Sequence, residues 1–134
     1  TAPVVFSLIK TAISCGIDGF TIANTKPISD DRLAVGKGGM SGKPLLTQTI
    51  QMVKEIRSEF GFDFIINACG GISNAYDLLS VLYAGANTGQ LLTAFIYKGP
   101  NIANNINNTL VKLIEKTGSK NITELVQQYS NLDK

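Results

Sequence analysis

Apolar residues recur along this chain in two alternating patterns, which together predict a regular succession of strands and helices. Short apolar runs at 17–24, 62–68 and 86–94 predict buried strands. Each run is followed by a segment in which apolar residues return every three or four positions, the spacing of a helix with one buried face. A further helical segment precedes the first run. The pattern therefore predicts three strand–helix units in series.

The predicted helices have recognisable starts, ends and inner faces. The first spans 4–14, and Pro44 opens the second because its fixed backbone angle suits a first helical turn. Ser73 is expected to cap the third helix, and Asn121 with Glu124 to cap a short last one. Glycines that end helices are expected at Gly16, Gly61, Gly85 and Gly118. Apolar residues predicted on the inner faces are Val5, Leu8, Ile9 and Ala12; Leu46, Ile50, Val53, Ile56 and Phe60; Leu78, Leu79 and Leu82; Ile102, Ile106, Leu110, Leu113 and Ile114; and Ile122, Leu125 and Val126.

The segment 25–43 has turn residues and no clear period, so it predicts a long functional loop. Its end, 38–45, reads Gly-Gly-Met-Ser-Gly-Lys-Pro-Leu. Three glycines and a serine just before a helix let the backbone approach a bound anion or a flat cofactor. The alternative is a flexible connector rich in turn formers.

Three strand–helix units predict an α/β fold with parallel strands and right-handed crossovers. Either a doubly wound sheet or part of a (β/α) barrel fits this pattern. Polar and glycine residues follow the strands, and both architectures bind ligands at that edge of the sheet. These residues are Asn24, Thr25, Gly70, Gly71 and Thr93.

Composition excludes several classes of function. The chain has 134 residues, enough for one domain, and its net charge of +2 without a basic run does not favour nucleic acid as a partner. Without histidine there is no Ser-His-Asp triad and no histidine metal site. Cys15 and Cys69 are too few for a zinc site and suit a reducing compartment. No apolar run approaches the roughly 20 residues of a membrane span, and no signal peptide is expected in this sequence.

Five motifs occur in the order and spacing of one enzyme family. They are 18–25 (Asp-Gly-Phe-Thr-Ile-Ala-Asn-Thr), 38–45, 69–72 (Cys-Gly-Gly-Ile), 84–86 (Ala-Gly-Ala) and 90–94 (Gln-Leu-Leu-Thr-Ala), with Lys98-Gly99-Pro100 after them. In these motifs the chain resembles the class 2, quinone-dependent dihydroorotate dehydrogenases, flavoenzymes of pyrimidine synthesis. The resemblance implies that residues 1–134 form the C-terminal part of a (β/α)₈ TIM barrel. It also implies that the N-terminal half is supplied by a missing portion or by a partner chain.

The resemblance implies roles for eight residues. Ser41, Gly42, Gly70, Gly71, Leu92 and Thr93 would surround FMN, while Asn24 and Thr25 would bind dihydroorotate or orotate. The family's catalytic serine comes from the N-terminal half, so no catalytic residue is expected in this chain. The electron acceptor would be a quinone. Membrane contact, at the mitochondrial inner membrane or the bacterial cytoplasmic membrane, would come only through a segment outside this chain.

Other interpretations remain open at this point. Ala23, Lys26 and Leu92 depart from the family pattern, so the chain could be a non-catalytic structural or assembly subunit, or another phosphate-binding barrel enzyme. Asn24 could be a turn residue that satisfies its own backbone. Lys37 and Lys43 are expected to be solvated. The inner face of the barrel is expected to carry Phe20, Ile22, Ile65 and Leu91.

Overall fold

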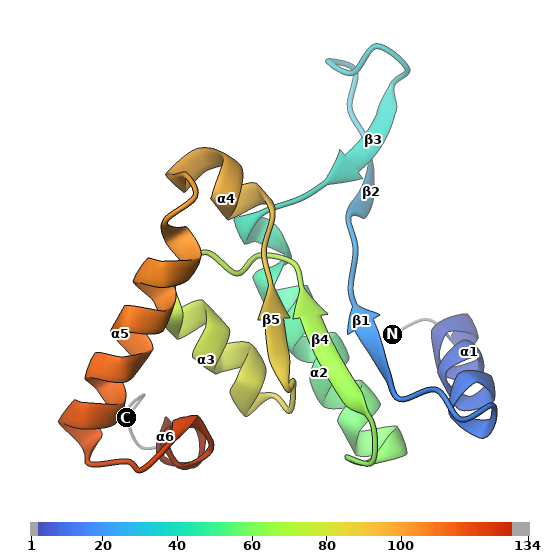
Figure 1. Ribbon diagram of the computed structural model, residues 1–134. Coiled ribbons are helices and arrows are strands. Elements are labelled where there is room, and N and C mark those ends of the chain that lie inside the picture. The colour runs from blue at the N-terminus through green and yellow to red at the C-terminus, as the bar shows by residue number, and fades with distance from the viewer. Residues whose placement is uncertain (1–2, 130–134) are drawn as a thin grey trace.

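The computed structural model describes residues 3–129 and contains a parallel sheet, an antiparallel hairpin and helices (Figure 1). The strands are β1 (Gly19–Ile22), β2 (Lys26–Ser29), β3 (Lys37–Met40), β4 (Ile65–Cys69) and β5 (Thr88–Gln90). The helices are α1 (Pro3–Ser14), the 3-10 turn η1 (Lys43–Leu45), α2 (Leu46–Phe60), α3 (Ala75–Tyr83), α4 (Thr93–Lys98), α5 (Ile102–Thr117) and α6 (Ile122–Tyr129). Residues 1, 2 and 130–134 of the predicted domain lie outside the described part.

The three parallel strands lie side by side in the order β1-β4-β5. Each new strand is added on the same side of the previous one, and the order never reverses as it does in a doubly wound sheet. Helix α2 packs against β1 and β4, and α3 packs against β5. This arrangement confirms the α/β prediction and selects a section of a barrel over a doubly wound sheet.

The core lies between the sheet and its covering helices. Val53 and Ile56 of α2 are fully buried, and they belong to the same cluster as Ile66 and Ala68 of β4 and Val81 of α3. A second cluster joins α3 to α5 and α6. The stripes predicted for α2 and α5 are thus confirmed at their buried positions.

The opposite face of the sheet is open and polar. Thr21, Asn67 and Thr88 lie level with one another on the three strands. The Asn67 side chain donates to Gln90 Oε1 at 2.8 Å and accepts from Thr88 Oγ1 at 2.9 Å. Ile65 is 53% exposed on this face. In a closed barrel, this face would point to the interior.

The prediction that Phe20 and Ile22 of β1 face the barrel interior was wrong. Phe20 and Ile22 point toward the helices, where Ile22 is 6% exposed and Phe20 packs edge-on against Phe64 at 5.4 Å between ring centres. Helix α1 was also only partly predicted. Its Ile9 is buried, but Leu8 is 65% exposed because nothing in the described chain covers that side of the helix.

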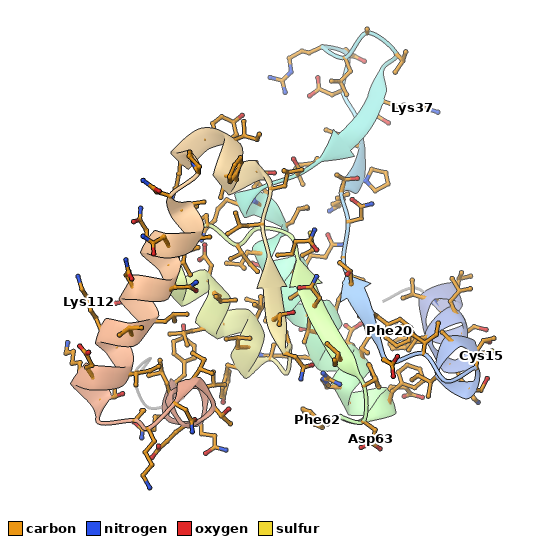
Figure 2. The ribbon with its side chains drawn as sticks, in the orientation of Figure 1. Cys15, Phe20, Lys37, Phe62, Asp63 and Lys112 are labelled. Carbon is orange, nitrogen blue, oxygen red and sulfur yellow. The ribbon has the colours of Figure 1, made fainter. Side chains whose placement is uncertain are left out.

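The segment predicted as a loop contains the antiparallel hairpin β2–β3, which projects away from the sheet (Figure 1). Lys37 lies on it, far from the sheet, in Figure 2. Gly38 and Gly39 are strand residues in this hairpin. A Cβ at Gly38 would lie 2.8 Å from the Leu33 side chain, and one at Gly39 would lie 2.7 Å from Thr25 Oγ1. These glycines therefore serve packing within the hairpin, whereas Gly42, the third glycine of the stretch, lines the candidate site.

Two helix starts differ from the prediction. The N-cap of α3 is Asn74, whose Oδ1 accepts from the Asp77 amide at 2.9 Å, and not Ser73. The third strand was expected to continue to residue 94, but β5 ends at Gln90 and helix α4 begins at Thr93. The cap of α6 is confirmed, because Asn121 Oδ1 accepts from the Glu124 amide at 2.9 Å.

Candidate functional site

A cavity of about 580 Å³ lies where the three parallel strands end. Its volume is within the range of about 300–1,000 Å³ that small-molecule and cofactor sites occupy. The cavity is lined by segments that follow β1, β3, β4 and β5: Asn24, Thr25, Ser41, Gly42, Lys43, Pro44, Leu45, Cys69, Gly70, Gly71, Ile72, Ser73, Gln90, Leu91, Leu92, Thr93, Ala94, Tyr97 and Lys98. All eight residues that the sequence singled out are in this set. The structure therefore brings them together, while their individual roles stay predictions.

The turn after β4 needs glycine at both positions. Gly70 and Gly71 have φ angles of +129° and +86°, which L side chains rarely adopt. A Cβ at Gly71 would lie 2.3 Å from the Leu46 amide nitrogen, and one at Gly70 would lie 2.7 Å from Thr49 Oγ1. The two glycines therefore allow the turn to lie close to the start of α2, and they also line the cavity.

Ser41 and Gly42 meet the start of α4 across the cavity. The Thr93 hydroxyl donates to Ser41 Oγ at 3.2 Å. Gly42 has a φ of +84°, and a Cβ there would lie 2.9 Å from Thr93 Cγ2. Because Thr93 opens a helix, its amide has no helical acceptor. Neither this amide nor that of Gly71 donates a hydrogen bond within residues 3–129.

Lys43 is exposed to solvent as predicted, at 57% of its side chain, and its ammonium also forms an ion pair with Asp77. The Asp77 side chain is 8% exposed and also accepts from the Ser73 amide at 2.9 Å and the Ser73 hydroxyl at 2.7 Å. Burial alone would raise the pKa of Asp77. The hydrogen bonds from Lys43 and Ser73 outweigh burial and hold this pKa below its usual value. Asp77 thus ties η1 to the turn after β4.

Sequence reasoning missed Asp77, Tyr97 and Lys98. An Asn followed three positions later by an acidic residue is a helix-start signal, and Asn74 with Asp77 fits it. Lys98 ends α4, and its Nζ donates to the Ser73 carbonyl at 2.9 Å. No signal in the sequence places Tyr97 and Lys98 at the cavity, since the predicted strand 86–94 extended into the first two residues of α4 and no helix was predicted there.

Asn24 follows β1 at the cavity wall. Its Oδ1 accepts from the Thr25 amide at 2.8 Å, the geometry of the turn residue considered as its alternative role. The side-chain NH₂ of Asn24 makes no hydrogen bond within residues 3–129, and Asn24 lines the cavity. The peptide bond between Ile22 and Ala23 is cis.

Cys69 is half-buried and lines the cavity as a free thiol. Within the described chain, no three His, Cys, Asp or Glu side chains gather where they could hold a metal ion. No helix among residues 3–129 is long and apolar enough to cross a membrane.

Comparisons with known proteins point to one family. A family model described as dihydroorotate dehydrogenase matches residues 6–114. A protein from Nautilia profundicola named dihydroorotate dehydrogenase (quinone) is 32% identical over 124 residues, which are 92% of this chain and 34% of the relative. A protein from Arabidopsis thaliana named dihydroorotate dehydrogenase (quinone), mitochondrial, is 34% identical over 124 residues, or 89% of this chain and 27% of the relative.

The fold is similar to solved structures that carry the same name. The ligand-free dihydroorotate dehydrogenase of Eimeria tenella aligns with a TM-score of 0.74 and 27% identity, covering 87% of this chain and 33% of that one. The same enzyme in complex with ferulenol aligns with a TM-score of 0.73. The chain therefore spans about a third of the length of the relatives that it matches.

Proposed function

Because this chain belongs to the dihydroorotate dehydrogenase family, in its quinone-dependent class, we propose that it forms the C-terminal part of an FMN-binding barrel. The complete barrel would oxidise dihydroorotate to orotate and pass the electrons to a quinone. The single observation that carries this proposal is the cavity of about 580 Å³, into which every predicted cofactor and substrate residue faces. The remaining strands would come from a further segment or from a partner chain.

The residues present fit FMN. The cavity wall has free amides at Gly71 and Thr93, and free amides at strand and helix ends favour a phosphate. Leu91, Leu92 and Ile72 supply apolar surface suited to a flat ring system. Among the lining residues within 3–129 there is no carboxylate to repel an anion. The chemistry that FMN supplies when bound is acceptance of a hydride from dihydroorotate and transfer of two electrons to a quinone.

The residues of this chain bind and orient in this proposal. Gly70, Gly71, Leu92 and Thr93 hold the phosphate through their amides and the Thr93 hydroxyl. Ser41 and Gly42 border the cofactor from the other side, positioned by the hydrogen bond between Thr93 and Ser41. Asn24 and Thr25 hold the pyrimidine. The proton that leaves the substrate with the hydride would go to a serine outside this chain, as in the family.

An apolar surface beside the cavity supports a quinone as the electron acceptor. Leu92, Ile96 and Tyr97, at the start of α4 and along it, are 69%, 70% and 85% exposed. A quinone is apolar and would gain from covering this surface. In this proposal the protein meets a membrane only through a segment other than residues 1–134, at the mitochondrial inner membrane or the bacterial cytoplasmic membrane.

A non-catalytic structural subunit is the second candidate. Ala23, Lys26 and Leu92 depart from the family pattern, and the cavity lining offers no histidine or carboxylate as a proton acceptor. Purification of the full-length protein or complex that carries this chain distinguishes the two candidate functions. Yellow material with flavin absorbance, bleached by dihydroorotate under anaerobic conditions, supports the enzyme. Colourless protein that takes up no added FMN supports the structural subunit.

Replacement of Asn24 tests the substrate role. Asn24→Ala should lose hydrogen bonds to a desolvated ligand, which costs about 1–3 kcal/mol, so dihydroorotate should bind about 5- to 150-fold more weakly. Bound FMN should be unchanged. Flavin content and the dihydroorotate dependence of flavin bleaching measure the two effects separately. Loss of flavin with normal substrate binding would assign Asn24 to the cofactor.

Replacement of Ile96 tests the quinone surface. Ile96→Asp places a charge where apolar contact is needed, and we expect about a tenfold rise in the apparent KM for a quinone. Reduction of a water-soluble dye should be unaffected, because a dye does not need this surface. Val111→Asp on α5 is the matched control, since Val111 is 51% exposed and does not line the cavity. Equal changes for dye and quinone would exclude a docking role for Ile96.

A further inference from the structure

Among residues 3–129, the charged residues that line the cavity are Lys43 and Lys98, and the two have different partners. Lys43 has a carboxylate partner, because its ammonium contacts Asp77. Asp77 is buried and lies outside the cavity lining, so this ion pair is neutral and tied to the helix start of α3. Lys43 therefore contributes little net charge to the cavity.

Lys98 has no carboxylate partner in the described chain. Its Nζ donates to the Ser73 carbonyl at 2.9 Å, which orients the ammonium without neutralising it. Ser73 lies two residues after Gly71, so the charge is held beside the glycine turn that lines the cavity. Side chains of a helix lean toward its N-terminus, which directs Lys98 back along α4 toward Thr93. One positive charge without a carboxylate partner therefore lines the same cavity as Gly71 and Thr93.

We propose that Lys98 recognises the phosphate of the bound cofactor, and that the Lys43–Asp77 ion pair leaves this task to Lys98 alone. The inference rests on the proposed function. A phosphate that meets free amides at Gly71 and Thr93 still carries excess negative charge, and an ammonium beside those amides stabilises it. Lys98 would exchange its bond to the Ser73 carbonyl for one to a phosphate oxygen.

The competing explanation is that Lys98 acts only within its own helix. A basic residue in the last turn stabilises a helix through the helix dipole. The two roles differ in what they require of the ligand. A role in the helix affects any flavin equally, whereas recognition of phosphate affects FMN and leaves riboflavin, which has no phosphate, unchanged.

The experiment measures Kd for FMN and for riboflavin with the full-length protein or complex after removal of its flavin. Lys98→Met should weaken FMN about tenfold or more, the usual effect of a lost charge-assisted hydrogen bond, and should leave riboflavin within error. Lys98→Arg keeps the charge and should restore most of the FMN affinity. Lys112→Met is the control, because Lys112 lies on the outer side of α5 (Figure 2) and does not line the cavity.

Preference for FMN over riboflavin that falls only in Lys98→Met supports the assignment. Equal weakening of both flavins would overturn it and make Lys98 a helix residue. Undiminished preference for FMN in Lys98→Met would also overturn it, while leaving the proposed function intact. A wild-type protein that binds neither flavin would refute the proposed function, and the assignment of Lys98 with it.

Discussion

Residues 1–134 produced alone should not oxidise dihydroorotate, even with added FMN and a dye as electron acceptor. The part of the cavity lining formed by residues 3–129 contains no histidine or carboxylate, and Ser41, which lines it, is assigned to the cofactor in the proposed function. General base catalysis is commonly worth about 10²- to 10⁴-fold in rate, so its loss should be plain in the assay. The open sheet face also leaves Ile65 exposed, and no element within residues 3–129 forms an opposite wall to enclose a substrate.

The control for this prediction is complementation. The same chain produced together with the N-terminal portion of the Nautilia profundicola relative should recover dihydroorotate-dependent dye reduction if the two parts assemble into a barrel. The isolated chain should instead dimerise or aggregate, because the outer edge of β1 is unpaired and apolar side chains such as Leu8 and Ile65 remain uncovered. Turnover by a soluble monomer of residues 1–134 would show that the base, the enclosing wall or both are present in this chain.

The sequence predicts best the parts whose residues interact with near neighbours. The stripe of α5 at Ile102, Ile106 and Leu110 is buried as expected, since one helix face against one neighbour produces a simple repeat. Gly118 ends that helix in the left-handed conformation that glycine favours. The site residues could likewise be gathered from sequence, because parallel strands bring their C-terminal ends to one edge.

What the sequence could not predict depends on contacts between distant segments. In sequence, Phe20 and Ile22 are equally compatible with either face of β1. The position of α2 determines that they point toward the helices. Gly38 and Gly39 look like ligand-binding glycines, but a Cβ at these positions would clash with the side chains of Leu33 and Thr25.

The same limit applies to Gly71. Gly71→Val would seem to test phosphate binding, yet the added side chain would strike the Leu46 backbone and displace the start of α2. Loss of flavin in that variant would therefore not isolate the phosphate contact. Variants of Lys98 are the better probe, because that side chain can change without a clash.

The sequence gives no indication that Arg57 stabilises the fold. Arg57 lies in the last turn of α2, only 5% exposed, and holds together the end of the sheet opposite the cavity. Its guanidinium donates to the carbonyls of Gly85 at 2.7 Å, Gly61 at 3.1 Å and Phe64 at 3.0 Å, and to Asn87 Oδ1 at 2.7 Å. It also stacks over the rings of Phe62 and Phe64, and Figure 2 shows Phe62 at this end of the sheet. Burial lowers the pKa of Arg57 from its usual value.

Arg57→Ala should therefore lower the free energy of unfolding by at least about 3 kcal/mol, because several buried acceptors lose a charged donor at once. Arg57→Lys should recover only part of this loss, since one ammonium cannot reach acceptors in the planar arrangement that a guanidinium matches. Urea unfolding of the full-length protein or complex measures both variants. The control is Arg32→Ala, which removes an 89% exposed arginine from its surface pair with Asp30 and should leave the unfolding midpoint unchanged. Equal midpoints for the Arg57 and Arg32 variants would mean that the end of the sheet is held by its apolar contacts alone.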